Sequence, residues 1–360
     1  MITANVLDFC YYPKSIFYAN TELFSRDVNR LMMKRKNITN ITIREYNQII
    51  MKNSDTSKYQ KEIIYSKNDT PRIPFITHRI WLTDPYDPKE MQQVLPEIIS
   101  QIQSTQKQFD ISAKQHNQKW NHYLWVQEQN LIPQTIQLFE QMGFRIKLLS
   151  ELKEMKIQRV QKQFSYYLED LRMIGAASDF IRGIIVKENG GVYLDNDYYF
   201  ESWDYNINYY FDFLGVQMGV TPTLRGINNA FFAAKQDHPI IQNYFTLMMD
   251  VFKFEDEEKE RPLFLNSCSF RTTASTIFGT GPPIISLAAM NFINQSGNQD
   301  IIVNKEYSGI FNHQTIQIID EKGEQKELKI EFIGKDIQTQ TWRRDMQDST
   351  IFGWPQFNSF

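Results

Sequence analysis

The chain has 360 residues, of which 42% are hydrophobic and 14% aromatic, so it can bury the core of one large or two modest domains. A formal net charge of −3 argues against a general nucleic-acid-binding protein, and two cysteines are too few for a disulfide framework or a thiolate metal cluster. The N-terminus lacks the basic start and apolar run of a signal peptide, and nowhere do 18 apolar residues follow one another. We therefore expect a soluble protein of a reducing compartment, without a membrane-spanning segment.

Residues 1–70 predict a separate, mostly helical extension. Within residues 21–36, apolar side chains recur at helical spacing, and this segment ends in four basic residues. Basic residues there complement the dipole at a helix C-terminus. Alternatively, they belong to an amphipathic helix that makes a peripheral contact with an anionic membrane or a target. The polar residues 52–71 are typical of a linker or a loosely packed connection.

From residue 71 onward, predicted strands alternate with predicted helices. The strands are expected at 73–82, 123–126, 144–149, 192–194, 213–218 and 328–333, and the helices at 91–118, 134–142, 176–189 and 240–254. Such alternation indicates a largely parallel sheet with helices on both faces. Ligands of these folds bind beyond the carboxyl ends of the strands.

One stretch, 176–201, concentrates the residues that carry chemistry. Its first half has an apolar stripe at helical spacing, and Gly190-Gly191 ends the predicted helix because glycine accepts the left-handed conformation found at helix C-termini. Asp179 and Arg182 lie three residues apart, on a face away from the stripe. They are either a surface ion pair of little energetic consequence or part of a functional site.

The strand predicted at 192–194 ends abruptly in Asp195-Asn196-Asp197. Carboxylates at a strand end, with Arg182 nearby, suit a divalent metal that bears a phosphorylated ligand. An Asp-x-Asp pair alone is weak, because turns after strands often carry aspartate. A calcium-binding loop is excluded, since it needs further oxygen ligands and a glycine where bulky aromatic residues follow here.

Taken whole, this stretch reads A-x-S-D-x-x-R, an apolar helix, then G-G-x-Y-x-D-x-D. It resembles the DXD segment of retaining glycosyltransferases of the GT-A fold, as in the glucosyltransferase domains of large clostridial toxins, the related Legionella effectors and the yeast-type mannosyltransferases. The resemblance implies an α/β fold over residues 71–360, with a GT-A type, Rossmann-like mixed sheet flanked by helices. Residues 1–70 would then be a helical N-terminal extension to this domain.

The resemblance also implies roles for the residues of the motif. Asp197 would ligate a metal directly, while Asp195 would bind the ribose and reach the metal through water. Asp179 and Arg182 would hold the sugar hydroxyls, with the arginine also placed to neutralise phosphate. Tyr193 falls among the residues expected to bind the nucleotide-sugar.

Weaker similarities extend on both sides of the motif. In the family, the residue at Trp81 stacks on the nucleotide base; the alternative is a core tryptophan with a satisfied indole N–H. Asn229 matches an asparagine that contacts the donor sugar, and is otherwise a turn residue. His238 is expected to cap or orient the helix at 240–254. Residues 280–282 match a Thr-Gly-Pro found in the yeast-type branch.

Relatives close their site with a C-terminal loop that supplies a further metal ligand and a tryptophan facing the phosphates. Thr341-Trp342 fits the Ser-Trp of that loop, and Asp336 falls where the family has a histidine. A second candidate loop, beginning at Asp348-Ser349, follows closely, and the sequence does not decide between the two.

The reaction implied is transfer of a hexose from a nucleotide-sugar to a hydroxyl, with retention of configuration and with Mn²⁺ or Mg²⁺ as the metal. UDP-glucose is the family's commonest donor, and UDP-N-acetylglucosamine and GDP-mannose are the alternatives. The acceptor expected from the toxin branch is Ser or Thr of a host protein, reached by an effector secreted into the host cytoplasm. A glycan-building enzyme and a degenerate sugar-nucleotide-binding protein are the other readings.

Overall fold

The computed structural model describes residues 63–114, 116–219, 225–251, 276, 280–303 and 314–337. Its centre is a seven-stranded sheet in the order β4-β3-β2-β5-β8-β7-β9, in which only β8 runs antiparallel to its neighbours. The strands are β2 (Ile76–Trp81), β3 (Asn121–Val126), β4 (Arg145–Leu148), β5 (Gly191–Leu194), β7 (Phe213–Gly219), β8 (Arg225–Ala234) and β9 (Asp300–Val303). The expected mixed, largely parallel α/β sheet is confirmed.

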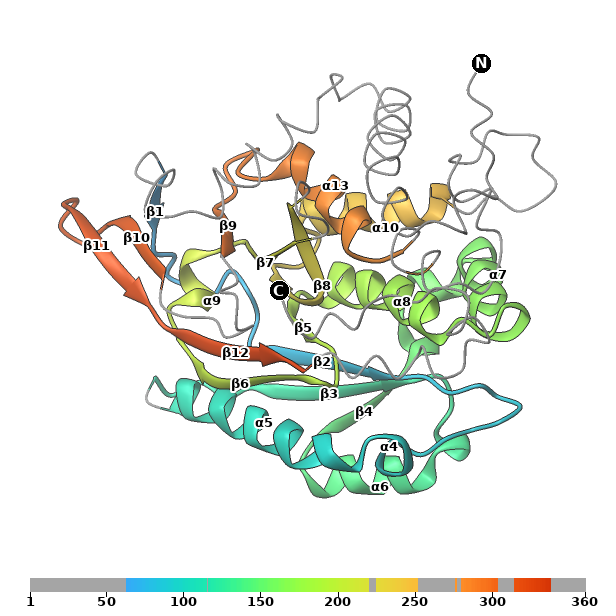
Figure 1. Cartoon of the computed structure of the whole chain (residues 1–360). Helices are drawn as coiled ribbons and strands as arrows, with labels where there is room; N and C mark the ends of the chain where they lie inside the picture. The colour runs from blue at the N-terminus through green and yellow to red at the C-terminus, as the bar shows by residue number, and fades with distance from the viewer. Residues whose placement is uncertain are drawn as a thin grey trace, which may run out of the picture.

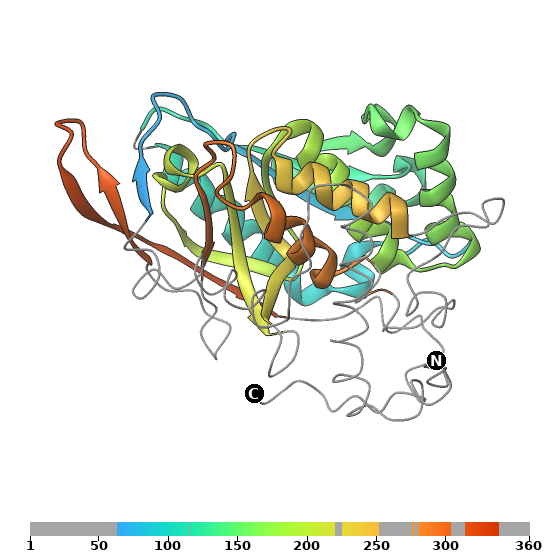
Figure 2. The same ribbon diagram turned by 90° about the horizontal axis from the view of Figure 1, so that it is seen from above.

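Helices cover both faces of this sheet. In Figure 1, α4 (Met91–Val94), α5 (Ile99–Lys114) and α6 (Pro133–Gln141) lie below it, and α8 (Ile174–Asn189) and α10 (Pro239–Val251) lie above. Figure 2, the view from above, shows α10 and α13 running over the sheet. The other helical segments are η2 (Pro96–Ile98), η3 (Gln129–Leu131), η4 (Leu149–Glu151), η5 (Glu154–Lys156), α7 (Gln158–Ser165), the π-helical turn η6 (Tyr166–Asp170), α9 (Ile207–Tyr210) and α13 (Pro282–Phe292).

Separate hydrophobic clusters hold the layers together. One unites α8, α10 and α13 with the sheet face beneath them, and a second packs α4, α5 and α6 against β2 and β3. The single helix predicted over 91–118 is wrong in one respect: it is broken at Leu95, which precedes Pro96 and adopts φ −138°. Proline disfavours the helical conformation of the residue before it, so a new helical segment starts at the proline.

Two smaller sheets flank the main one. The first is made of β1 (Ile64–Ser66), β10 (Gln314–Ile319) and β11 (Gln325–Ile330), and the second pairs β6 (Tyr198–Trp203) with β12 (Phe332–Asp336). The strand predicted at 328–333 is therefore wrong as one element, since it covers the end of β11 and the start of β12, which belong to different sheets. Paired structure begins at Ile64, within the stretch interpreted as a linker.

The unit formed by α8 and β5 matches its prediction. Helix α8 ends at Gly190, where φ is +63°, and Gly191 follows with φ +96°. A Cβ on Gly191 would lie 2.6 Å from the carbonyl oxygen of Ile76, so the close approach of β2 also requires glycine here. Among the described residues, helices are all too short or too polar to cross a membrane. The helix expected at 21–36 lies outside the described residues.

Candidate functional site

The Asp195–Asp197 turn lies where β5 ends and β6 begins, and hydrogen bonds fix it on several sides. The N–H of Asp195 donates to the Ala230 carbonyl at 2.8 Å, and the N–H of Tyr198 donates back to the Asp195 carbonyl at 3.0 Å. The Asp197 carbonyl accepts from the N–H of Ile337 at 3.1 Å, just after β12. Strands β8 and β12, distant in sequence, therefore help to position the two carboxylates that local sequence delivers.

Arg182 connects the helix to this turn. Its Nη2 lies 2.9 Å from Asp179 Oδ1 and 3.2 Å from Asp195 Oδ1, while its Nη1 donates to the Asn229 carbonyl at 2.7 Å. The guanidinium also lies over the ring of Tyr193, 4.8 Å from its centroid. The structure thus brings Asp179, Arg182, Asp195 and Asn229 together, and the surface-ion-pair alternative is wrong because the Asp179 and Arg182 side chains are only 7% and 5% exposed.

Asp179 has protein partners on both of its carboxylate oxygens. Asn229 Nδ2 donates to its Oδ1 at 2.8 Å, and Thr280 Oγ1 lies 2.7 Å from its Oδ2. Burial raises the pKa of Asp179, and the Arg182 guanidinium opposes that rise. The alternative reading of Asn229 as a turn residue is wrong, because it lies within β8. From there its side chain and its carbonyl tie Asp179 and Arg182 to the sheet.

Tyr193 and Asp195, at the end of β5, are joined by a hydrogen bond. The hydroxyl of Tyr193 donates to Asp195 Oδ1 at 2.5 Å from a side chain that is almost fully buried. Burial raises the pKa of Asp195 to about 7; the Arg182 guanidinium opposes the rise, and the Asp197 carboxylate adds to it. Negative charge is thus concentrated at this strand end, which favours a cation there.

The donor set of the turn fits a hard divalent cation, which prefers carboxylate oxygens. Asp195 and Asp197 supply such oxygens, and the Oδ1 of Asn196 is buried without a hydrogen-bond partner among the described residues, although its Nδ2 donates to the Ile80 carbonyl at 2.7 Å. Asp336 approaches from β12, where it pairs with Tyr198 and accepts from Asn228 Nδ2 at 3.1 Å. Within the described part of the chain, no three acidic, histidine or cysteine side chains are already gathered as a ligand set.

Trp81 lies in the hydrophobic core with its indole N–H bonded, which is the alternative to base stacking. Its side chain packs in the hydrophobic cluster of α4–α6 and is 9% exposed, and its indole N–H donates to the Lys89 carbonyl at 3.0 Å. Base stacking by Trp81 stays a prediction. Thr341, Trp342 and the alternative loop at Asp348-Ser349 lie outside the described residues.

His238 performs the structural role expected of it. Its Nδ1 accepts from the N–H of Ile240 in the first turn of α10 at 3.1 Å, so its Nε2 carries the proton donated to Asp300 at 2.9 Å. The ring thereby orients α10 against β9.

Sequence reasoning missed two contributors to the site. Thr280 was noted only as part of a weak three-residue match, and its contact with Asp179 spans 101 positions of the chain. Arg79 gave no signal beyond being a charged residue inside an apolar strand, and it bonds the carbonyls of Asp195 and Tyr198. A charged residue in the middle of a predicted buried strand was the sign that could have drawn attention to it.

Residues 103–208 match the family described as "Glycosyltransferase sugar-binding region containing DXD motif". This matched region includes α8, β5 and the Asp195–Asp197 turn. No curated protein sequence matches the chain.

Among solved structures, the chain is similar to the PaToxG glycosyltransferase, with 14% identity, a TM-score of 0.47, and coverage of 70% of this chain and 77% of that one. It is similar to the UDP-bound glycosyltransferase domain of the YGT toxin, with 10% identity, a TM-score of 0.39, and coverage of 64% and 79%. It is also similar to the catalytic domain of α-toxin from Clostridium novyi, with 14% identity, a TM-score of 0.37, and coverage of 78% and 84%. The sequence similarity to each of these structures is distant. Residues 103–208, which hold α8, β5 and the Asp195–Asp197 turn, are similar to the DXD-containing sugar-binding region of glycosyltransferases.

Proposed function

We propose that the chain transfers a hexose from a nucleotide-sugar to a hydroxyl group, with UDP-glucose as the donor and Ser or Thr of a protein as the acceptor. The observation that carries this proposal is the buried network in which Arg182 joins Asp179, Asp195 and the Asn229 carbonyl beside the Asp195–Asp197 turn. UDP-glucose and a protein acceptor rest on the motif's resemblance to the toxin enzymes. UDP-N-acetylglucosamine and GDP-mannose remain the donors to be compared with it.

Asp197 and Asp195 would hold a divalent cation, with Asp336 as the candidate for a further ligand. When bound, Mn²⁺ or Mg²⁺ supplies Lewis-acid stabilisation of the negative charge that grows on a pyrophosphate leaving group. The turn needs little reorganisation for this task, because backbone and side-chain hydrogen bonds hold it on several sides. The electrostatic free energy needed to hold two carboxylates near each other is therefore supplied when the protein folds and not when the cation binds.

The residues around the turn would orient the donor. Arg182 supplies a fixed cation: burial opposes its charge, but the neighbouring Asp195 carboxylate raises its pKa above the usual range. Asp179 and Asn229 hold that guanidinium in place and are themselves candidates to meet sugar hydroxyls. Tyr193, through its hydroxyl, fixes the Asp195 carboxylate for contact with the ribose.

Donor hydrolysis tests the proposal without knowledge of the acceptor. The chain is incubated with UDP-glucose, UDP-N-acetylglucosamine or GDP-mannose, each with Mn²⁺, with Mg²⁺ and with excess EDTA. We expect metal-dependent release of UDP from UDP-glucose at a rate above that from the other donors. Binding of a nucleotide-sugar without hydrolysis or transfer of any donor would instead identify a degenerate binding protein.

A further inference from the structure

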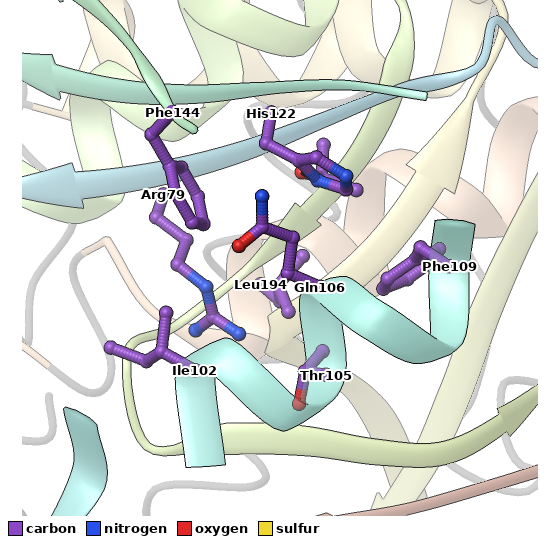
Figure 3. A pocket seen from close by; sticks show the side chains of 9 residues that line it. Arg79, Ile102, Thr105, Gln106, Phe109, His122, Phe144 and Leu194 are labelled. Atoms are coloured by element: carbon purple, nitrogen blue, oxygen red, sulfur yellow. Dashed lines mark hydrogen bonds between the residues drawn. The ribbon is translucent and has the colours of Figure 1, made fainter. Parts of the chain in front are cut away.

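Arg79 is a charged residue buried in the interior beside the Asp195–Asp197 turn. It lies in β2 and is only 2% exposed. Figure 3 shows its side chain between the sheet and α5, with the guanidinium beside Ile102. The surrounding side chains include Thr105, Gln106 and Phe144. Its guanidinium is therefore surrounded by protein groups.

Both ends of the guanidinium fork bind the turn itself. Nη1 donates to the Asp195 carbonyl at 2.6 Å, and Nη2 donates to the Tyr198 carbonyl at 3.1 Å. These carbonyls are three residues apart and enclose Asn196 and Asp197. A planar fork with fixed donor directions can hold two such acceptors at once, which a lysine ammonium on a flexible stem does less well.

The next residue of β2 adds to this attachment. The Ile80 carbonyl accepts from Asn196 Nδ2 at 2.7 Å, so consecutive residues of β2 bind the first two residues of the turn and Tyr198, which follows it. Hydrogen bonds therefore anchor the chain on both sides of Asp197. This arrangement fixes the turn from below, while Arg182 approaches from α8.

Arg79 also carries a positive charge into the interior. Within the described residues it forms no ion pair, and taking an unpaired cation out of water costs several kcal/mol. The negative charges that act on it include those of Asp197 and Asp195. A buried cation beside these carboxylates offsets their mutual repulsion as well as binding two carbonyls.

We propose that Arg79 is a positioning residue that fixes the Asp195–Asp197 turn for metal binding, holding its backbone through two carbonyls and offsetting the repulsion between its carboxylates. The metal-binding half of this inference rests on the proposed function. The backbone half does not, because it concerns hydrogen bonds within the protein, which can be measured without a cation. The two halves can therefore be measured separately.

The test compares Arg79→Met and Arg79→Lys with Arg72→Met in the full chain. Arg72 is a matched control, because it also binds a backbone carbonyl, that of Tyr209 at 3.2 Å, and pairs with Asp212 at 3.0 Å, in another part of the fold. Hydrogen–deuterium exchange measures the rate of amide exchange in the peptide that covers residues 195–200, in protein without added metal. Calorimetric titration with MnCl₂ in the presence of UDP reports cation binding, and Tm reports folding.

We expect amide exchange in residues 195–200 to be at least about tenfold faster in Arg79→Met than in wild type, because one anchor of the turn is lost. Mn²⁺ affinity should fall by about 10- to 100-fold, the usual effect of removing a group that orients metal ligands. Arg79→Lys keeps the charge, so its exchange rate and Mn²⁺ affinity should lie between those of wild type and Arg79→Met. This milder change keeps the test valid if Arg79→Met does not fold. Arg72→Met should lower Tm with unchanged exchange in this peptide and unchanged Mn²⁺ affinity.

Two results would overturn the inference. One is exchange of residues 195–200 in both Arg79 variants that equals wild type. The other is a loosened turn that still binds Mn²⁺ with wild-type affinity. If wild type itself binds no Mn²⁺, the proposed function fails, and the exchange measurement alone decides whether Arg79 positions the turn.

Discussion

Asp179 Oδ1 and Arg182 Nη2 lie 2.9 Å apart on consecutive turns of α8, and both side chains are buried. The pair is held in one orientation, because Asn229 and Thr280 occupy the other acceptor sites of the carboxylate. Arg182 is thereby aimed at Asp195, 3.2 Å away. A helix and a strand end, which the sequence joins through two glycines, are thus linked electrostatically as well.

Removing the charge of Asp179 should disturb both folding and activity. In Asp179→Asn, the Arg182 guanidinium loses one of its two carboxylate partners in a buried setting. We expect a loss of about 3 kcal/mol in the free energy of unfolding and a fall in kcat/KM for donor hydrolysis of at least about 100-fold. Glu154→Gln is the control, since it removes a partner of Lys187 at the other end of α8. Near-wild-type hydrolysis by Asp179→Asn would show that the pair has only a structural role.

The hydroxyl of Thr280 should act on the reaction through Asp179. Thr280→Val preserves the shape of the side chain and removes the hydroxyl 2.7 Å from Asp179 Oδ2. We expect kcat/KM to fall by about tenfold and stability by about 1–3 kcal/mol, the cost of leaving a buried acceptor without its partner. Thr135→Val is matched to it, because it removes a buried hydroxyl 2.6 Å from Glu90, away from the site. Equal effects of both variants on kcat/KM at 25 °C would contradict a specific role for Thr280.

His78 should make the stability depend on pH. Its Nδ1 accepts from the indole N–H of Trp125 at 3.1 Å, so its Nε2 is the nitrogen that donates to the Gly190 carbonyl at 2.8 Å. A second proton would place two donors face to face, and burial lowers the pKa of His78 to about 4 from its ordinary value of 6.5. The unfolded chain therefore binds more protons between these two pH values than the folded chain does.

The free energy of unfolding therefore rises with pH between about 4 and 6.5. The contribution of His78 is complete above pH 6.5 and is lost as the pH falls towards 4, with a total of about 3 kcal/mol. Urea unfolding of wild type and His78→Gln across this range measures it, and the variant should show a shallower dependence. His116→Gln changes an exposed histidine stacked on Tyr205 and should keep the wild-type slope. An unchanged slope in His78→Gln would refute the assignment.

One variant, Trp81→Ala, distinguishes base stacking by Trp81 from a role in the hydrophobic core alone. The buried ring predicts that Trp81→Ala loses about 3–5 kcal/mol of stability. UDP affinity, corrected for the folded fraction, then decides on stacking. An additional loss of about 1–3 kcal/mol in binding would support contact with the base. Unchanged affinity of the folded molecules would leave Trp81 as a core residue.

The parts of the site that the sequence predicts are those built by local chain geometry. Helix α8, the glycine pair and β5 follow one another directly, so their periodicity and turn residues predict the delivery of Asp179, Arg182 and Asp195. Thr280, Arg79 and the carbonyl of Asn229 reach the same place from distant elements, and no spacing in the sequence reveals that. Strand β8 was missed for a related reason: its antiparallel pairing with β5 and β7 is a tertiary property.

The fold shows the same division between local and distant effects. The alternation of strands and helices predicts the parallel sheet, yet the break between β11 and β12 depends on which partner each strand finds. Strand β12 leaves its neighbour in sequence and pairs with β6, which carries Asp336 to the Asp195–Asp197 turn. The strand-like pattern at 328–333, in which Lys329 and Glu331 alternate with apolar residues, gives no sign of that exchange of sheets.

The central claim is that Asp197 holds a divalent cation on which sugar transfer depends, and donor hydrolysis by Asp197→Asn measures it most directly. UDP release from UDP-glucose is followed with Mn²⁺ and with excess EDTA, and Glu201→Gln, which changes an exposed carboxylate in the neighbouring strand β6, is the control. We predict that turnover falls by at least about 100-fold in Asp197→Asn and in wild type with EDTA, while Glu201→Gln behaves as wild type. Full activity of wild type in excess EDTA, or of Asp197→Asn with Mn²⁺, would contradict the account.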